Sequence, residues 1–332
     1  MMTRSKTRVD LLRRLVRGVI WVVVIVLALL FLPPATGNLV SQANPAGSYA
    51  EAILRIEILK AGEASGFNAA CRTRIMTHGR KAKRVIVFFH GYTSCPQQYQ
   101  ALGEAFYDLG YNVLAVPLPH HGLIDRMTEE QARLTAEELA AYADEVIDIA
   151  QGLGEEVTLA GLSGGGVVVG WAAQQRNDID LAVLISPAFG FGQIPTPLTL
   201  PATNLFRLLP NFYQWWQPDL KEAGGLAHSY PRYSSHALAQ ILRLSHATQV
   251  AARQKTPAAR ALLVITNAND TSVNNELTSQ VVEQWRQHGV KDLRTYEFDA
   301  GLKLDHDLID PAQPDQRIDI VYPQIIELVT NL

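Results

Sequence analysis

The chain has 332 residues, of which 48% are apolar and 18% charged, and its formal net charge is −3. This composition suits a packed globular core and excludes a disordered chain. The near-neutral charge supplies no basic field for nucleic acid, so we expect no nucleic-acid partner. The length accommodates one large domain and an extension.

The N-terminus is basic at first and then strongly apolar. Residues 18–32 carry no charge, Pro33 and Pro34 follow, and six cations precede them at Arg4, Lys6, Arg8, Arg13, Arg14 and Arg17. A basic flank before an apolar run directs a chain to the membrane, and the basic side stays in the cytoplasm. We therefore expect residues 1–32 to form a cytoplasmic tail and a signal-anchor, that is, a transmembrane helix.

Two alternatives for this segment stay open. The run is intermediate between a signal-peptide core of about 7 to 15 residues and a span of about 17 to 25. Small residues at Ala35, Thr36 and Gly37 offer a cleavage site, after which the protein would be exported. A buried soluble helix is disfavoured by the cations at its start. Anchor and signal both place the catalytic domain outside the cytoplasm.

The region after the apolar run changes character twice. Residues 33–50 are rich in Pro, Gly, Ala, Ser and Asn, so residues 33–69 are interpreted as a linker and lead-in segment. Cys71 and Cys95 are the two cysteines of the chain. Outside the cytoplasm they can form a disulfide, with two free thiols as the alternative.

From about residue 84 short apolar runs alternate with helical patterns. Strands are predicted at residues 84–91, 112–119, 156–161, 180–187, 261–267 and 293–298. Helices are predicted at residues 96–110, 135–154, 164–175 and 274–289. Such alternation predicts an α/β fold, with a mainly parallel central sheet and helices on both faces, over residues 70–332.

Residues 187–235 interrupt this alternation. They contain many Pro and Gly residues and no visible strand pattern, together with an apolar cluster at Phe206, Leu208, Leu209, Phe212, Tyr213, Trp215 and Trp216. An insertion of this size after a core strand indicates a cap over the site. The alternative is a surface excursion packed by its own aromatic residues.

The strongest chemical signal is the G-x-S-x-G motif at residues 161–165. It lies between a predicted strand and a predicted helix, which is the context of a nucleophile elbow. Small neighbours are needed there because the turn is strained and the serine must project from it. Ser163 is therefore the candidate nucleophile.

A serine hydroxyl needs a base, and that base is oriented by an acid. The expected order after the serine is acid and then histidine. His306 follows the last predicted strand in a loop, and Asp270 follows the strand before it. Asp305 and Asp307 are weaker candidates for the acid, because adjacent side chains usually point apart. Four other histidines fit less well: His228, His236, His246 and His288.

Two backbone amides are expected to form an oxyanion hole. One belongs to Gly164, which follows the nucleophile, and the other to Tyr92, in the loop after the first buried strand. His90 precedes Gly91 in that loop, and we interpret it as shaping the loop. The pair His120 and His121 lacks accompanying metal ligands, so we expect no metal and no cofactor.

These motifs together resemble the α/β-hydrolase superfamily. The resemblance covers about residues 70–332 and rests on HGYTSCPQQ, LPHHG, GLSGGG, NANDTSV and LDHDL. Bacterial carboxylesterases and monoacylglycerol-lipase-like or serine-aminopeptidase-like members are the most similar. The resemblance implies Ser163 as nucleophile, Asp270 as acid, His306 as base, and Tyr92 and Gly164 as oxyanion donors. Gly164 departs from the pattern, since relatives often carry a larger residue there.

The expected activity is hydrolysis of a carboxylic ester through an acyl-enzyme. The apolar cap favours a small-molecule ester with a hydrophobic group. A peptidase or amidase of the same fold is the alternative, with Asp219 or Glu222 in the cap holding a substrate amine. A non-catalytic binding protein is a third possibility, which the complete order of serine, acid and histidine disfavours.

Overall fold

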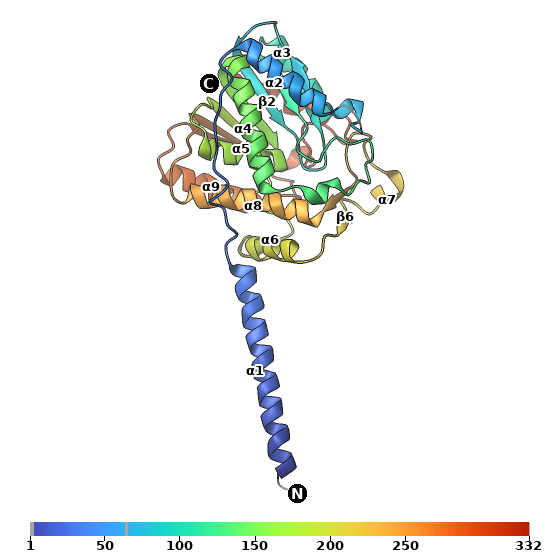
Figure 1. Ribbon diagram of the computed structural model, residues 1–332. Helices are drawn as coiled ribbons and strands as arrows, with labels where there is room; N and C mark the ends of the chain where they lie inside the picture. The colour runs from blue at the N-terminus through green and yellow to red at the C-terminus, as the bar shows by residue number, and fades with distance from the viewer. Residues whose placement is uncertain (1–2, 64–65, 332) are drawn as a thin grey trace.

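The computed structural model describes residues 3–63 and 66–331. A globular domain stands at one end of a single long helix, α1 (Thr3–Phe31), which projects away from it (Figure 1). Within α1, Arg13–Phe31 forms a 19-residue stretch of mean hydropathy 2.4, none of it buried. This length and composition suit a membrane span or a signal sequence. The side chains of Arg4, Lys6 and Arg8 lie outside the described part.

A seven-stranded sheet forms the centre of the domain. In spatial order its strands are β1 (Arg74–Met76), β3 (Asn112–Val116), β2 (Ala82–Phe89), β4 (Gly154–Leu162), β5 (Leu181–Ile185), β8 (Ala261–Asn267) and β9 (Leu293–Phe298). Only β1 is antiparallel to its neighbour. The six predicted strands all form, and the predicted α/β architecture is confirmed. The short β1 is an addition.

Helices cover both faces of this sheet. Those that follow α1 are α2 (Tyr49–Gly62), α3 (Gln100–Asp108), α4 (Ala136–Leu153), α5 (Gly164–Gln175), α6 (Thr199–Leu208), α7 (Leu220–Ala223), α8 (Ser235–Ala252), α9 (Asn275–Gln287) and α10 (Ile318–Thr330). One core cluster contains α3 and α10, and the other contains α2, α4, α5, α8 and α9. The helix ranges predicted from the sequence omit α2, α6, α7, α8 and α10.

The pleat of β2 explains why both faces must be covered. Val85, Val87 and Phe89 enter one core cluster, and Ile86 and Phe88 enter the other. All five side chains are essentially inaccessible. Because successive side chains point to opposite faces, a continuous apolar run requires a helical layer on each side.

The insertion predicted as a cap has secondary structure of its own. It contains α6, the short α7 and a two-stranded sheet of β6 (Tyr213–Trp215) and β7 (Arg232–Ser234). α8 follows directly and packs on both α5 and α6. Strands so short leave no readable alternation, which is why no strand was predicted there.

Residues 33–48, interpreted from the sequence as a linker, are bound along the domain. The Asp144 carboxylate accepts hydrogen bonds from Ser41 and from the Gln42 amide, at 2.5 and 2.6 Å. The Trp171 indole donates to the Leu39 carbonyl at 3.0 Å. α2 then packs against α4, so the globular unit begins before residue 70. The partners lie about 100 residues away in sequence, beyond the reach of a local pattern.

Candidate active site

Ser163 occupies a sharp turn between β4 and α5. Its backbone has φ 56° and ψ −115°, a conformation that is strained for any residue with a side chain. A Cβ atom at Gly161 would lie 2.3 Å from the Gly165 carbonyl oxygen, and one at Gly165 would lie 2.0 Å from that of Phe89. Both glycines of the motif are therefore required by close backbone packing, as a nucleophile elbow demands.

Asp270 and His306 are paired at the same edge of the sheet. The turn after β8 carries Asp270, and the loop after β9 carries His306. His306 Nδ1 lies 2.7 Å from Asp270 Oδ2. The other oxygen of Asp270 accepts from the amides of Ser272 and Val273 at 2.9 and 3.2 Å. An ionised Asp270 accepts a hydrogen bond from the Nδ1–H group and leaves Nε2 as the basic nitrogen.

Burial and charge act in opposite directions on this pair. Burial by itself lowers the pKa of His306, but the hydrogen bond and charge of Asp270 outweigh it and hold the pKa above its ordinary value. The charges of Asp307 and Asp305 act in the same direction. Burial likewise raises the pKa of Asp270, yet its hydrogen bonds, chiefly with His306, keep that pKa below the usual range. The pair thus favours an ionised acid beside a basic imidazole.

The two candidate oxyanion donors lie side by side. A Cβ atom at Gly164 would be 3.2 Å from Tyr92 Cβ and 3.3 Å from the Tyr92 nitrogen. Among the described residues, neither amide donates a hydrogen bond to another group. A larger residue at position 164 would press on the Tyr92 backbone.

His90 shapes the loop that carries Tyr92. Its Nδ1 donates to the Gly91 carbonyl at 2.8 Å, and its Nε2 accepts from the Leu118 amide at 2.8 Å. Burial, followed by the neighbouring His121, lowers the pKa of His90 well below its ordinary value. Both ring nitrogens of His90 are used in hydrogen bonds to the backbone. His90 is therefore a neutral side chain that supports the loop, as its position in the sequence indicated.

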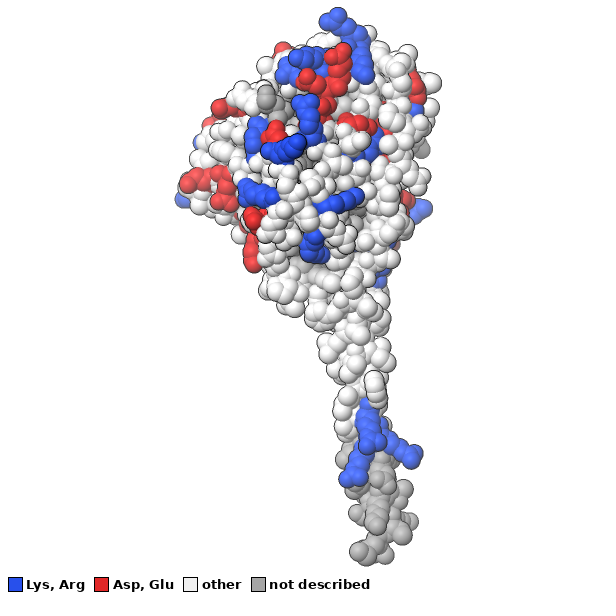
Figure 2. Space-filling view, turned by 90° about the vertical axis from the view of Figure 1, so that its left-hand side faces the viewer, with Lys and Arg blue, Asp and Glu red and all other residues white. Residues whose placement is uncertain are grey.

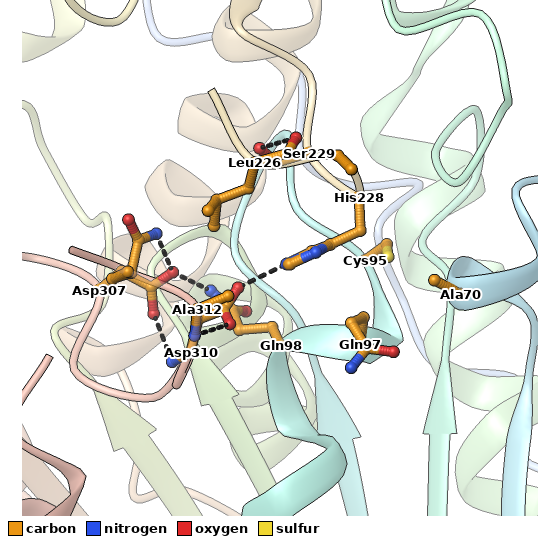
Figure 3. A network of polar contacts seen from close by, with 12 residues as sticks. Ala70, Cys95, Gln97, Gln98, Leu226, His228, Ser229, Asp307, Asp310 and Ala312 are labelled. Atoms are coloured by element: carbon orange, nitrogen blue, oxygen red, sulfur yellow. Dashed lines mark hydrogen bonds and ion pairs between the residues drawn. The ribbon is translucent and has the colours of Figure 1, made fainter. Parts of the chain in front are cut away.

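The buried side-chain amide of Gln98 joins the loop of the base to the loop of the oxyanion donor, and Figure 3 shows it next to Asp307. Gln98 Oε1 accepts from the Gly91 amide at 2.9 Å, and Gln98 Nε2 donates to Asp307 Oδ2 at 2.9 Å. Asp307 adjoins His306 in the chain, and Gly91 adjoins Tyr92. A Cβ atom at Gly91 would also lie 3.7 Å from Ser163 Cβ. Gln98 was not predicted from the sequence, because its two partners come next to it only in the folded chain.

A second contact in Figure 3 connects the cap to the base loop. His228 Nε2 lies 2.6 Å from the buried Asp310 carboxylate. The structure also joins Cys71 and Cys95 by a disulfide, and the Cys71 sulfur lies 3.4 Å from the His228 carbonyl. Four segments therefore meet at this point: the segment before β1, the oxyanion loop, the cap and the loop that carries His306.

The cap also holds the oxyanion loop through Tyr92. The Tyr92 hydroxyl donates to Gln131 or the Ser234 carbonyl and accepts from the Ser234 amide, at 3.0 to 3.1 Å. The adjacent Thr93 hydroxyl accepts from the Trp216 indole at 2.7 Å. The Trp216 ring makes an edge contact with the Tyr92 ring and a tilted contact with the Tyr233 ring. Apolar cap side chains thus border the candidate oxyanion hole.

The structure brings most of the predicted site together. Asp270 contacts His306, Gly164 contacts Tyr92, and Ser163 lies beside Gly91. No hydrogen bond joins Ser163 to His306 among the described residues. Nor does the described part of the chain contain a group of three His, Cys, Asp or Glu side chains able to hold a metal ion.

The sheet order and the elbow define an α/β-hydrolase fold. The chain belongs to the serine aminopeptidase S33 family of hydrolases, whose sequence profile matches residues 80–298. That match includes the elbow and Asp270 and ends before His306. No curated protein matches the sequence.

Solved structures confirm the fold at low sequence identity. The metagenome-derived lipolytic enzymes LipS and LipT are represented by a structure with a TM-score of 0.59 and 16% identity, covering 80% of this chain and 100% of that one. A monoacylglycerol lipase from Paleococcus ferrophilus has a TM-score of 0.58 and 20% identity, and the match covers 78% of this chain and 98% of that one. A soluble variant of monoglyceride lipase from Saccharomyces cerevisiae has a TM-score of 0.56 and 14% identity, and the match covers 78% of this chain and 90% of that one.

Proposed function

We propose that the protein is a serine hydrolase that cleaves carboxylic esters with a hydrophobic group. The observation that carries this proposal is the strained Ser163 elbow beside the free amides of Tyr92 and Gly164. The Asp270–His306 pair on the same edge of the sheet supplies the base. An elbow of this kind is costly to maintain, and its use is to present a nucleophile.

In the proposed reaction His306 Nε2 takes the Ser163 proton as Oγ bonds to the ester carbonyl carbon. The amides of Tyr92 and Gly164 donate to the resulting oxyanion. The bond to the alcohol then breaks, and His306 gives that alcohol its proton. Water attacks the acyl-enzyme, His306 again takes the proton, and release of the acid returns it to Ser163.

The aromatic side chains of the cap support a hydrophobic ester. The solved structures described above are named as lipases or lipolytic enzymes, and this chain shares their fold. The family description favours the second candidate, hydrolysis of an N-terminal peptide bond. Asp219 and Glu222, the acidic residues considered for holding an amine, are exposed at α7 on the outer edge of the cap (Figure 1). We therefore place the ester first.

Labelling with a fluorophosphonate probe tests the nucleophile. The probe should label the purified protein at Ser163, and Ser163→Ala should remove the label while keeping the fold, because alanine fits the same turn. Loss of a triad member should lower kcat on p-nitrophenyl esters by roughly 10⁴ to 10⁶. A panel that includes aminoacyl anilides compares ester with amide hydrolysis. Labelling elsewhere, or full activity in the alanine variant, would overturn the assignment.

We also propose that α1 anchors this hydrolase in a membrane, with the domain outside the cytoplasm. The exposed apolar stretch Arg13–Phe31 and the basic residues at its start support this orientation. Export after cleavage of a signal is the alternative. The soluble domain would then keep the same site.

A further inference from the structure

A groove lies where α1 meets the cap. Its volume is about 430 Å³, and its lining includes Leu29 and Leu32 from the N-terminal segment and Arg207 and Leu208 from α6. The Asn204 amide on α6 donates to the carbonyls of Leu30 and Leu32, at 2.9 and 2.8 Å. These bonds hold α6 against the end of α1, so the groove belongs to a fixed junction.

The groove has an apolar side and a polar rim. Leu29, Leu32 and Leu208 are exposed by 46%, 56% and 60%, which is unfavourable for large side chains in water. Arg133, Arg207 and His236 line the same groove. A ligand that fits has an apolar chain and an anionic group close to each other.

Arg207 is the guanidinium of this groove that forms no ion pair with a described carboxylate, although the charge of Glu137 acts on it from a distance. Among the side chains that the structure describes, no carboxylate lies within ion-pair distance of it, and it makes a long hydrogen bond of 3.4 Å to Asn204. Glu137 is already bound by Arg243 through two hydrogen bonds of 2.7 Å. Partial burial, and then the charge of Arg243, lower the pKa of Arg207. A bound anion would stabilise this guanidinium.

The groove is also at the height of a lipid headgroup. A helix of 19 residues spans about 28 Å, close to the hydrocarbon thickness of about 30 Å. Leu32 and Pro33 therefore lie at the far boundary. Figure 2 shows that on the visible face the part of the domain next to α1 carries no Lys, Arg, Asp or Glu. Leu205 on α6 and Leu209 directly after it are also exposed.

We propose that this groove binds one anionic phospholipid of the surrounding leaflet. Its phosphate lies at Arg207, and one acyl chain runs along Leu29, Leu32 and Leu208. The proposal rests on the proposed membrane anchoring and is independent of ester hydrolysis. Such a lipid would lock the cap to the bilayer surface.

Retention of lipid by the full-length chain tests this proposal. The Ser163→Ala protein, which cannot consume the lipid, is reconstituted in nanodiscs of phosphatidylcholine with or without phosphatidylglycerol and extracted for native mass spectrometry. One phosphatidylglycerol should stay bound. Arg207→Gln should reduce its retention about tenfold, the loss of roughly one charge-assisted contact. Arg207→Lys should keep most of it, because the charge remains.

Arg80→Gln is the matched control. Arg80 is also exposed, but it lies in the turn before β2, at the start of a central strand and not in the cap. Retention of phosphatidylglycerol should be unchanged in this variant. Equal retention of both lipids, or full retention by Arg207→Gln, would overturn the proposal. Activity on a soluble short-chain ester, measured with Ser163 intact, should be the same for Arg207→Gln and the parent. If the fluorophosphonate probe fails to label the protein with Ser163 intact but phosphatidylglycerol is still retained, the hydrolase assignment is wrong and the lipid site stands.

Discussion

His306 depends on Asp270 for both its orientation and its charge. The 2.7 Å contact fixes the ring and the tautomer that exposes Nε2. Asp270→Asn should therefore lower kcat by roughly 10⁴ while the protein stays folded. Steady-state kinetics on p-nitrophenyl esters checks this, with circular dichroism for folding.

Asp305→Asn is the matched control for this change. The loss in kcat should be small, because Asp305 contributes charge and no hydrogen bond to the imidazole. Asp307→Asn should also cost much less than Asp270→Asn. If either control were the severe variant, the choice of acid would be wrong.

The raised pKa of His306 predicts where activity is lost in acid. In the proposed mechanism His306 must be neutral to accept the Ser163 proton. We therefore expect kcat/KM to fall as the pH drops through the His306 pKa, which is raised above the ordinary value of about 6.5. In Asp270→Asn the charge of Asp270 and the charge-assisted hydrogen bond to it, which are the largest causes that raise the pKa, are gone, whereas burial remains. The acid limb should then move to lower pH. A pH–rate profile of both proteins measures this, and an unmoved limb would contradict it.

At the scale of elements, the site is built from loops that hold each other. Gln98 connects the loop after β9 to the loop after β2. Gln98→Leu removes both hydrogen bonds and frees the Tyr92 loop to shift. A displacement of about 1 Å at such a site costs roughly 100-fold in rate, so kcat should fall about 10- to 100-fold with a smaller change in KM.

Gln100→Leu provides the comparison for Gln98→Leu. Gln100 begins α3 and bonds to Glu104 on the helix surface, so kcat should be unchanged. Melting temperatures should be measured for both variants, because a buried unsatisfied amide also costs about 1–3 kcal/mol. A lowered melting temperature with normal kcat would show that Gln98 is structural only.

Local pattern predicted the elements that have a strong period or cap. α4 begins with the expected capping box, in which Thr135 and Glu138 satisfy each other's backbone amides. β8 and β9 have the predicted bounds. α2 was missed, although Ser48 caps it by accepting from the Glu51 amide. α10 contains Pro323, which interrupts a helical pattern.

What sequence could not reveal are contacts between distant segments. The order of motifs led to Ser163, Asp270 and His306 because strand ends meet at one edge of a parallel sheet. Gln98, and the Tyr92 hydroxyl bonded to the cap, become visible only when loops meet. The same holds for the docking of residues 33–48, whose partners are on α4 and α5.

For the whole molecule, the prediction concerns topology. Cells stripped of any outer barrier and treated with protease should lose the hydrolase domain, because the basic residues before the apolar run hold the N-terminus inside. The full-length chain should fractionate with membranes. A soluble chain that begins near Asn38 would favour a cleaved signal, and a protected cytosolic chain would rule out both anchor and export.

The docked segment after α1 determines how far the site can move from a membrane. A flexible linker of about 16 residues has a root-mean-square end-to-end distance of roughly 20–24 Å, so the domain could move by about that distance relative to α1. Here the bonds of Asp144 and Trp171 remove that freedom, so the domain would stand at one height and tilt. Encounters with membrane esters would then take place in two dimensions, where lateral diffusion of the substrate brings it to Ser163. Esters fixed to tall neighbouring proteins, far from the bilayer surface, would be beyond the enzyme's reach.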